Sequence, residues 1–168
     1  MTAVPAAVAT FRLGLPDGWR LVTSSEVAAP ASTLVATHAS PTASGFTPNV
    51  TVAILETVTE DEVAGVGSEA LRRLEADGHN VQIRRREALG VGRSEGLAQE
   101  LRFSTRVGDR EVEIAQVLLV LVVPRVDQSG GLCACATTLT VAVEDLEARA
   151  ADLRALIAGL GVVPDPTA

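Results

Sequence analysis

The chain of 168 residues is long enough for one domain with a substantial core, and its 47% hydrophobic share is that of a globular protein. All 14 basic residues are arginine and 21 residues are acidic, which gives a formal net charge of −7. This charge disfavours nonspecific attraction to nucleic acid or to anionic membranes, and the 2% aromatic share offers few rings for base stacking. We therefore expect an aliphatic core and no nucleic-acid partner.

The N-terminal stretch MTAVPAAVATFRLGLP lacks the basic start and the long apolar segment of a secretory signal. The longest strongly apolar run, from Ala115 to Pro124, is about half of the roughly 20 residues that span a bilayer as a helix. These features predict a cytoplasmic protein without membrane insertion.

The first third of the chain predicts short strands joined by turns and loops. Strands are expected at 10–15, 19–22 and 33–39, with a turn at Pro16-Asp17-Gly18 and a loop or single helical turn over 23–32. A loop rich in Ser, Thr, Gly and Pro covers 40–49, and NVTVAILETV then begins the first clear strand.

The first long helix is predicted over 59–77. Thr59 and Glu62 have the spacing of a capping box, in which each side chain can accept a hydrogen bond from the other residue's backbone N–H. Gly78 supplies the stop. The apolar stripe has helical spacing and comprises Val63, Val66, Ala70, Leu71 and Leu74.

Four strands joined by short connections are predicted next, at 80–89, 94–105, 111–124 and 132–143. The last consists largely of small residues, which suits a central strand with helices packed closely against it. A second helix is expected over 144–159, and the tail from about residue 162 should fray. Its predicted stripe comprises Leu146, Ala150, Leu153, Ile157 and Leu160.

Because consecutive strands are joined by short turns, the sheet should be mainly antiparallel. The predicted fold class is α+β, with about seven or eight strands packed by two long helices. The whole chain, 1–168, is expected to form one domain.

Two short motifs carry a resemblance to a known superfamily. LP-x-GW comprises Leu15, Pro16, Gly18 and Trp19, and GF-x-PNV spans 45–50 before the apolar strand. With the helix and strand order that follows, this pattern resembles the superfamily of the photosystem protein PsbP, the Ran-binding Mog proteins and the actinobacterial LpqN-type lipoproteins, and is most similar to the LpqN-type branch. The resemblance implies a PsbP/Mog-like sandwich of sheet and helices. The LpqN-type lipobox cysteine has no counterpart near the start of this sequence, so secretion is not inferred.

The residues of GFTPNV have two readings. Phe46 can close the end of an aliphatic core while Pro48 and Asn49 shape the start of the strand. Alternatively, Phe46 and Trp19 stay partly exposed as aromatic anchors of a protein-binding surface.

No catalytic, cofactor or metal site is predicted. Cys133 and Cys135 are expected to be buried thiols, because no histidine or third cysteine lies near them in the sequence. His38 and His79 sit in no recognisable nucleophile or metal motif. The glycines of GVGRSEG (90–96) have the wrong spacing for a phosphate loop and are typical of a hairpin turn.

Arg84, Arg85 and Arg86 lie in the strand at 80–89, which is interpreted as an edge protected by charge. Strict alternation would place Arg84 and Arg86 on one face and Arg85 on the other, with Val81 and Ile83.

Two classes of function follow. The superfamily resemblance implies a noncatalytic protein-binding, adaptor or secretion and assembly accessory protein, whose partner is another protein or a second copy of this chain in a homodimer. Its candidate contact residues are Trp19, Phe46, Asn49 and Arg85. The alternative is a small enzyme or small-molecule-binding protein with a pocket between sheet and helix.

Overall fold

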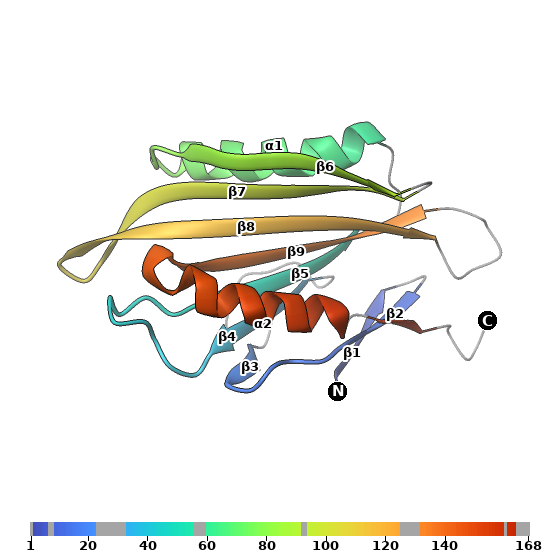
Figure 1. The fold of residues 1–168 in the computed structure, drawn as a ribbon, viewed down its shortest axis with the longest axis horizontal. Coiled ribbons are helices and arrows are strands. Elements are labelled where there is room, and N and C mark those ends of the chain that lie inside the picture. Colours follow the sequence, from blue (N-terminus) through green and yellow to red (C-terminus); the bar gives the residue numbers. More distant parts are fainter. Residues whose placement is uncertain are drawn as a thin grey trace.

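The computed structural model describes residues 2–6, 9–22, 33–55, 60–91, 94–124, 132–159 and 161–163. Within these ranges a seven-stranded sheet has the order β3-β4-β5-β9-β8-β7-β6, and every strand pair in it is antiparallel (Figure 1). The α+β class and the antiparallel sheet are confirmed. The strands are β3 (Trp19–Val22), β4 (Thr33–His38), β5 (Asn49–Leu55), β6 (Gln82–Val91), β7 (Ser94–Val107), β8 (Arg110–Pro124) and β9 (Leu132–Ala142).

The ends of the chain form a second, three-stranded antiparallel sheet of order β1-β2-β10. Its strands are β1 (Thr2–Ala6), β2 (Ala9–Leu13) and β10 (Gly161–Val163). The predicted strand at 10–15 therefore belongs to this small sheet. The tail was expected to fray from about residue 162, but Val162 and Val163 pair with β2, whereas 164–168 lie outside the described residues.

The two helices lie close to their predicted positions. The first, α1 (Glu60–Ala76), is followed by Gly78 at a φ of +86°, a conformation that favours glycine and ends the helix. The predicted cap at Thr59 lies outside the described residues. A 3₁₀ turn, η1 (Val143–Asp145), leads into α2 (Leu146–Ala158).

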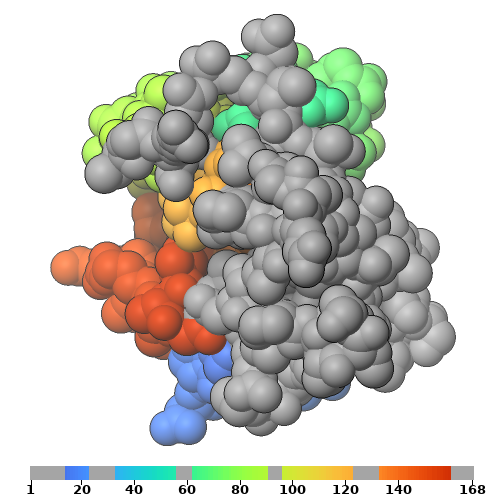
Figure 2. All heavy atoms as spheres, turned by 90° about the vertical axis from the view of Figure 1, so that its right-hand side faces the viewer, coloured from blue at the N-terminus to red at the C-terminus, as the bar shows by residue number. Residues whose placement is uncertain are grey.

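The helices pack against opposite faces of the sheet. Leu153 and Leu156 of α2 join a core with β3, β4, β5, β8 and β9, on what we call the α2 face. Val63 of α1 packs on the other face, the α1 face, against β7, β8 and β9. In Figure 2, α2 (orange-red) lies at the left of the view and α1 (green) at the upper right.

Only the central strands β8 and β9 contribute buried residues to both the core under α2 and the core under α1. Cys133 and Cys135 of β9 face α2, whereas Ala134 and Ala136 face α1, and all four are buried. The prediction that this strand of small residues is central is confirmed. The core under α2 includes no residue of β6 or β7. The α2 face of these strands carries the exposed pair Arg85 and Glu87 on β6 and the half-buried pair Glu100 and Arg102 on β7.

The helix α1 approaches the sheet closely at Gly67. A Cβ there would come within 2.6 Å of the Leu97 side chain. The buried Gln99 amide donates a hydrogen bond to the Gly67 carbonyl at 2.9 Å. From β6, Arg86 donates to the Ala64 carbonyl and the Ser68 hydroxyl, which ties the outermost strand to the helix.

Leu156, which the predicted stripe of α2 omits, is 1% exposed and belongs to the core of the α2 face. We expect Leu156→Ala to lower the free energy of unfolding by roughly 2–5 kcal/mol, since it deletes a fully buried side chain. Urea titration followed by circular dichroism measures this. Arg154→Ala, at an exposed position of the same helix, should change stability by no more than about 0.5 kcal/mol. Equal effects of the two substitutions would contradict this packing of α2.

Candidate functional site

The LP-x-GW motif forms a tight turn that buries Trp19. Gly18 has a φ of +83°, and a Cβ there would lie 2.7 Å from Nε2 of His38, so two constraints favour glycine. The Trp19 backbone N–H donates to the Pro16 carbonyl. The Trp19 side chain is 8% exposed within the core of the α2 face, and it is therefore a core plug.

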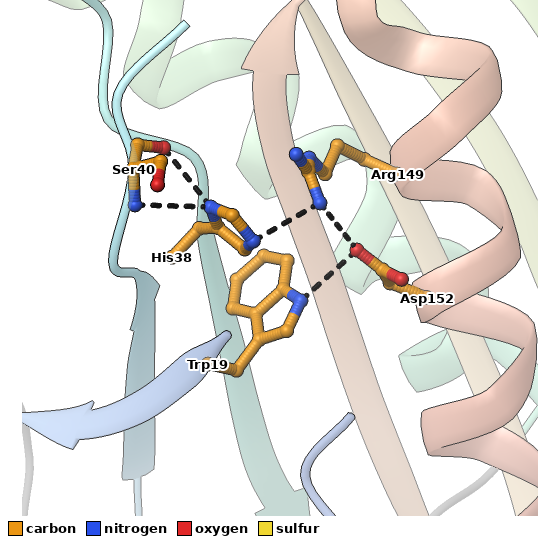
Figure 3. Close-up of polar contacts among 5 residues, drawn as sticks. All are labelled: Trp19, His38, Ser40, Arg149 and Asp152. Atoms are coloured by element: carbon orange, nitrogen blue, oxygen red, sulfur yellow. Dashed lines mark hydrogen bonds and ion pairs between the residues drawn. The ribbon is translucent and has the colours of Figure 1, made fainter. Parts of the chain in front are cut away.

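Trp19 is joined to α2 by a polar cluster, shown in Figure 3. Its Nε1 donates to Oδ2 of Asp152 at 3.1 Å, and the same oxygen accepts from Nη1 of Arg149 at 2.9 Å. Arg149 Nη1 also lies 3.1 Å from Nε2 of His38. The cluster connects β3, β4 and α2 across long sequence separations.

The cluster selects the tautomer of His38. A guanidinium group only donates, so Nε2 of His38 must accept from Arg149. Both the Ser40 carbonyl, at 2.9 Å, and the Ser40 N–H, at 3.2 Å, lie near Nδ1, which cannot donate to one and accept from the other at once. With Nε2 accepting from Arg149, Nδ1 carries the hydrogen and donates to the carbonyl. Both ring nitrogens are thus engaged in holding the fold, which gives the imidazole a structural role.

Phe46 lies in a closed loop at the start of β5. Gly45 has a φ of +83° and donates to the Thr42 carbonyl, while the Thr42 N–H donates to the Phe46 carbonyl. Ser44 of the loop donates its N–H to the carboxylate of Glu144 in η1. The Phe46 side chain is half-buried against a small core cluster that includes Phe103. The ring thus packs as the first interpretation expects and keeps part of its surface exposed, and protein binding through it stays a prediction.

The candidate contact residues do not form one site. Asn49 is half-buried at the start of β5 and pairs with Thr37 of β4, one strand away from Trp19. Arg85 lies on β6, at the opposite end of the strand order. The sequence could not predict this separation, because strand order is set by pairing between distant segments.

Among the described strands, β6 forms one edge of the sheet, and every residue from Gln82 to Ala88 is exposed. The predicted edge position is confirmed. Arg85 pairs with Glu87 at 2.6 Å, with the two side chains 65% and 48% exposed. This ion pair raises the pKa of Arg85 and lowers that of Glu87.

The predicted alternation of the arginines is wrong. Ile83 pairs with Leu101 and Arg85 with the next residue of β7, Glu100, so Arg84 is an extra residue in a β-bulge. The bulge shifts the alternation by one residue. Ile83 and Arg86 therefore share the α1 face, and Arg85 lies on the α2 face. Ile83 is 48% exposed, and among the described residues it is the one large hydrophobic residue that is exposed.

Three hollows lie on the surface near the Phe46 loop, β8 and the β6–β7 hairpin. One of about 510 Å³ lies between the Phe46 loop, β8 and η1, and one of about 370 Å³ lies beside His79 and Arg102. Both include Glu111 and Glu113 of β8. The third, of about 240 Å³, is apolar and lies between α1 and the end of the β6–β7 hairpin. In the part of the chain that the structure describes, no group of His, Cys, Asp or Glu could hold a metal ion.

Cys133 and Cys135 are buried, as predicted. Burial raises the pKa of the Cys135 thiol from 9.0 to about 11, although its contact with Thr137 lowers it. Because its pKa is raised, the folded state holds the Cys135 proton more tightly than the unfolded state does, and this contribution to stability is fully present below pH 9. This contribution is lost as the pH rises from about 9 towards 11.

We expect Cys135 to resist alkylation in the folded protein. In a Cys133→Ser variant at pH 8, iodoacetamide should label the native chain on the order of 100-fold more slowly than the urea-unfolded chain, because the native thiol is buried and protonated. Mass spectrometry of quenched samples gives both rates. Similar rates would show that Cys135 is accessible.

The Trp19–Asp152 hydrogen bond gives a second prediction. Asp152→Ala should cost about 1–3 kcal/mol, because it leaves the Trp19 N–H and Arg149 without their shared acceptor. The chain contains one tryptophan, so fluorescence during urea unfolding reports directly on this ring. Glu147→Ala, at an exposed position of the same helix, is the control and should be nearly neutral. An equally small effect of both would show that the bond does not hold α2.

The chain matches no established protein-family profile, and no curated protein sequence matches it significantly. Among the described residues, no helix is long and apolar enough to cross a membrane.

Solved structures with similar folds do exist. LpqN of Mycobacterium tuberculosis, described as involved in cell envelope biogenesis, is 17% identical with a TM-score of 0.55, over 93% of this chain and 84% of LpqN. Cyanobacterial PsbP of Synechocystis is 16% identical with a TM-score of 0.55, over 95% of each chain. The Ran-binding protein Mog1p of Saccharomyces cerevisiae is 12% identical with a TM-score of 0.52, over 94% and 91%. The chain therefore has the PsbP/Mog-like fold that its two sequence motifs implied.

Proposed function

We propose that this chain is a noncatalytic protein-binding module that serves as an adaptor or an assembly accessory. The observation that carries the proposal is the edge strand β6, where seven consecutive residues, Gln82 to Ala88, are exposed. They include Ile83, whose aliphatic side chain has no part in the buried core clusters. A strand of this kind can contribute main-chain hydrogen bonds and side-chain contacts to a partner.

The chemistry of the described residues supports binding over catalysis. His38 is engaged with Ser40 and Arg149, and His79 contacts the Ser104 carbonyl. The Cys135 thiol is buried and its pKa is raised, which opposes nucleophilic reactivity. The alternative, a small-molecule pocket between sheet and helix, has one matching feature in the 240 Å³ hollow. Its lining is apolar and offers no converging polar groups for catalysis.

The similar structures support only the class of function. Mog1p is described as Ran-binding, so the fold can carry a protein-binding role. At 12–17% identity neither Ran binding nor a role in cell envelope biogenesis can be transferred to this chain. A cytoplasmic location is part of the proposal.

The proposal keeps Arg85 and Phe46 as contact residues, because both side chains reach the surface. Trp19 is buried in the core of the α2 face, at the opposite end of the strand order from Arg85, and is not a surface contact in this proposal. Asn49 stays a candidate at the start of β5, next to the Phe46 loop.

Affinity capture from the cell of origin tests the proposal. The wild-type chain should retain a protein in near-stoichiometric amounts, and Arg85→Glu should lose most of it while keeping a cooperative melt. Arg154→Glu on α2 makes the same charge change at an exposed position and should behave as wild type.

Phe46→Ala separates packing from binding at the loop. We expect a loss of about 1–3 kcal/mol in unfolding free energy, less than for a fully buried ring, together with weaker capture. Sedimentation of each variant shows whether the partner is a second copy. If Phe46→Ala only destabilises and Arg85→Glu leaves capture and sedimentation unchanged, this assignment of contacts is wrong.

A further inference from the structure

The surface chemistry of β6 indicates what kind of partner it fits. We propose that β6 accepts an extended acidic segment of a partner protein, added as a further antiparallel strand at this edge. This inference rests on the proposed protein-binding function and deepens it by naming the chemistry of the bound segment.

Charge is the first argument. The strand carries three arginines and one glutamate, a net charge of +2, on a chain whose formal net charge is −7. Arg84 is exposed at the bulge. The Arg85–Glu87 pair is well exposed, and such surface pairs contribute little free energy, so Arg85 can exchange its partner for an incoming carboxylate. Carboxylates on an added strand would meet Arg84 and Arg85 across the new pair of strands.

The apolar hollow is the second argument. Its lining includes Val63 and Ala64 of α1 and Ala88 and Leu97 of the hairpin. Ala88 pairs with Leu97 on the α1 face, so a residue opposite Ala88 on an added strand would direct its side chain to the same face, beside the hollow. An antiparallel segment would then carry an apolar residue followed about three residues later by an acidic one, opposite Arg85.

The same features disfavour a second copy of this chain at the edge. Antiparallel pairing of β6 with itself would bring two sets of three arginines together, and the extra residue at Arg84 interrupts the register. The arginines and the bulge therefore oppose self-association while leaving the edge attractive to an acidic segment.

Synthetic peptides test this directly. The probe is a fluorescein-labelled peptide of about ten residues that alternates threonine and valine. One leucine is placed to lie opposite Ala88, and two glutamates about three residues later are placed to meet Arg84 and Arg85. Two matched peptides replace the glutamates by glutamine or the leucine by serine. Fluorescence anisotropy at low ionic strength should show the acidic peptide binding about tenfold more tightly than the glutamine peptide, and several-fold more tightly than the serine peptide.

The site is assigned with a charge-matched pair of variants. Arg84→Glu combined with Arg85→Glu should weaken binding of the acidic peptide at least about tenfold. Arg20→Glu combined with Arg154→Glu makes the same charge change at exposed positions away from β6 and should leave binding within about twofold. No binding of the acidic peptide, equal binding of the glutamine peptide, or equal losses in both variants would overturn the inference.

These outcomes are separable from those of the capture experiment. If wild type captures a protein that Arg85→Glu loses, but the acidic peptide does not bind, the acidic-strand inference fails and the proposed function stands. If the peptide binds as expected and the chain captures no protein, the binding edge stands and the proposed function fails.

Discussion

The architecture depends on the burial of β9 on both faces. Its side chains alternate between the cores under α2 and α1, and those facing the two helices near its start are cysteine and alanine. Small side chains let helices approach a central strand closely, and burial on both faces requires one helix on each side. Because each helix covers only part of a seven-stranded sheet, the outer strands contribute buried residues to the core under one helix at most.

The two edge strands of this sheet, β3 and β6, differ in length and in how they are attached to the rest of the fold. At β3 the strand is short, and the Trp19, Arg149 and Asp152 contacts fasten it to α2. At β6 the strand is long, its residues from Gln82 to Ala88 are exposed, and it is held by its pairing with β7 and by Arg86, which reaches α1. A long exposed edge invites aggregation unless charge or a bulge opposes it, and β6 has both. The proposed selective binding requires an edge strand that is exposed to a partner and carries charge and a bulge that oppose aggregation.

Much of this fold could be predicted from local signals. Gly18, Gly45, Gly78 and Gly108 all have positive φ and mark turns or a helix end that composition and spacing also indicate. The bulge at Arg84 could not be predicted, because it reflects sheet geometry and has no distinctive residue. The Trp19–Asp152 bond joins residues 133 positions apart, and β10 pairs with a strand at the other end of the chain. Such pairings depend on three-dimensional proximity that periodicity does not encode. The separation of the candidate contact residues across the sheet follows from strand order, which local sequence patterns do not encode.

The central claim is that β6 is the edge at which a partner binds. Hydrogen–deuterium exchange of the chain, alone and with its captured protein bound, tests it at the level of the backbone. An added strand would hydrogen-bond to outward-facing amides of β6, so the account predicts slower exchange in peptides covering 82–90 and little change in α2. Protection confined to other elements, with exchange at 82–90 unchanged, would contradict it.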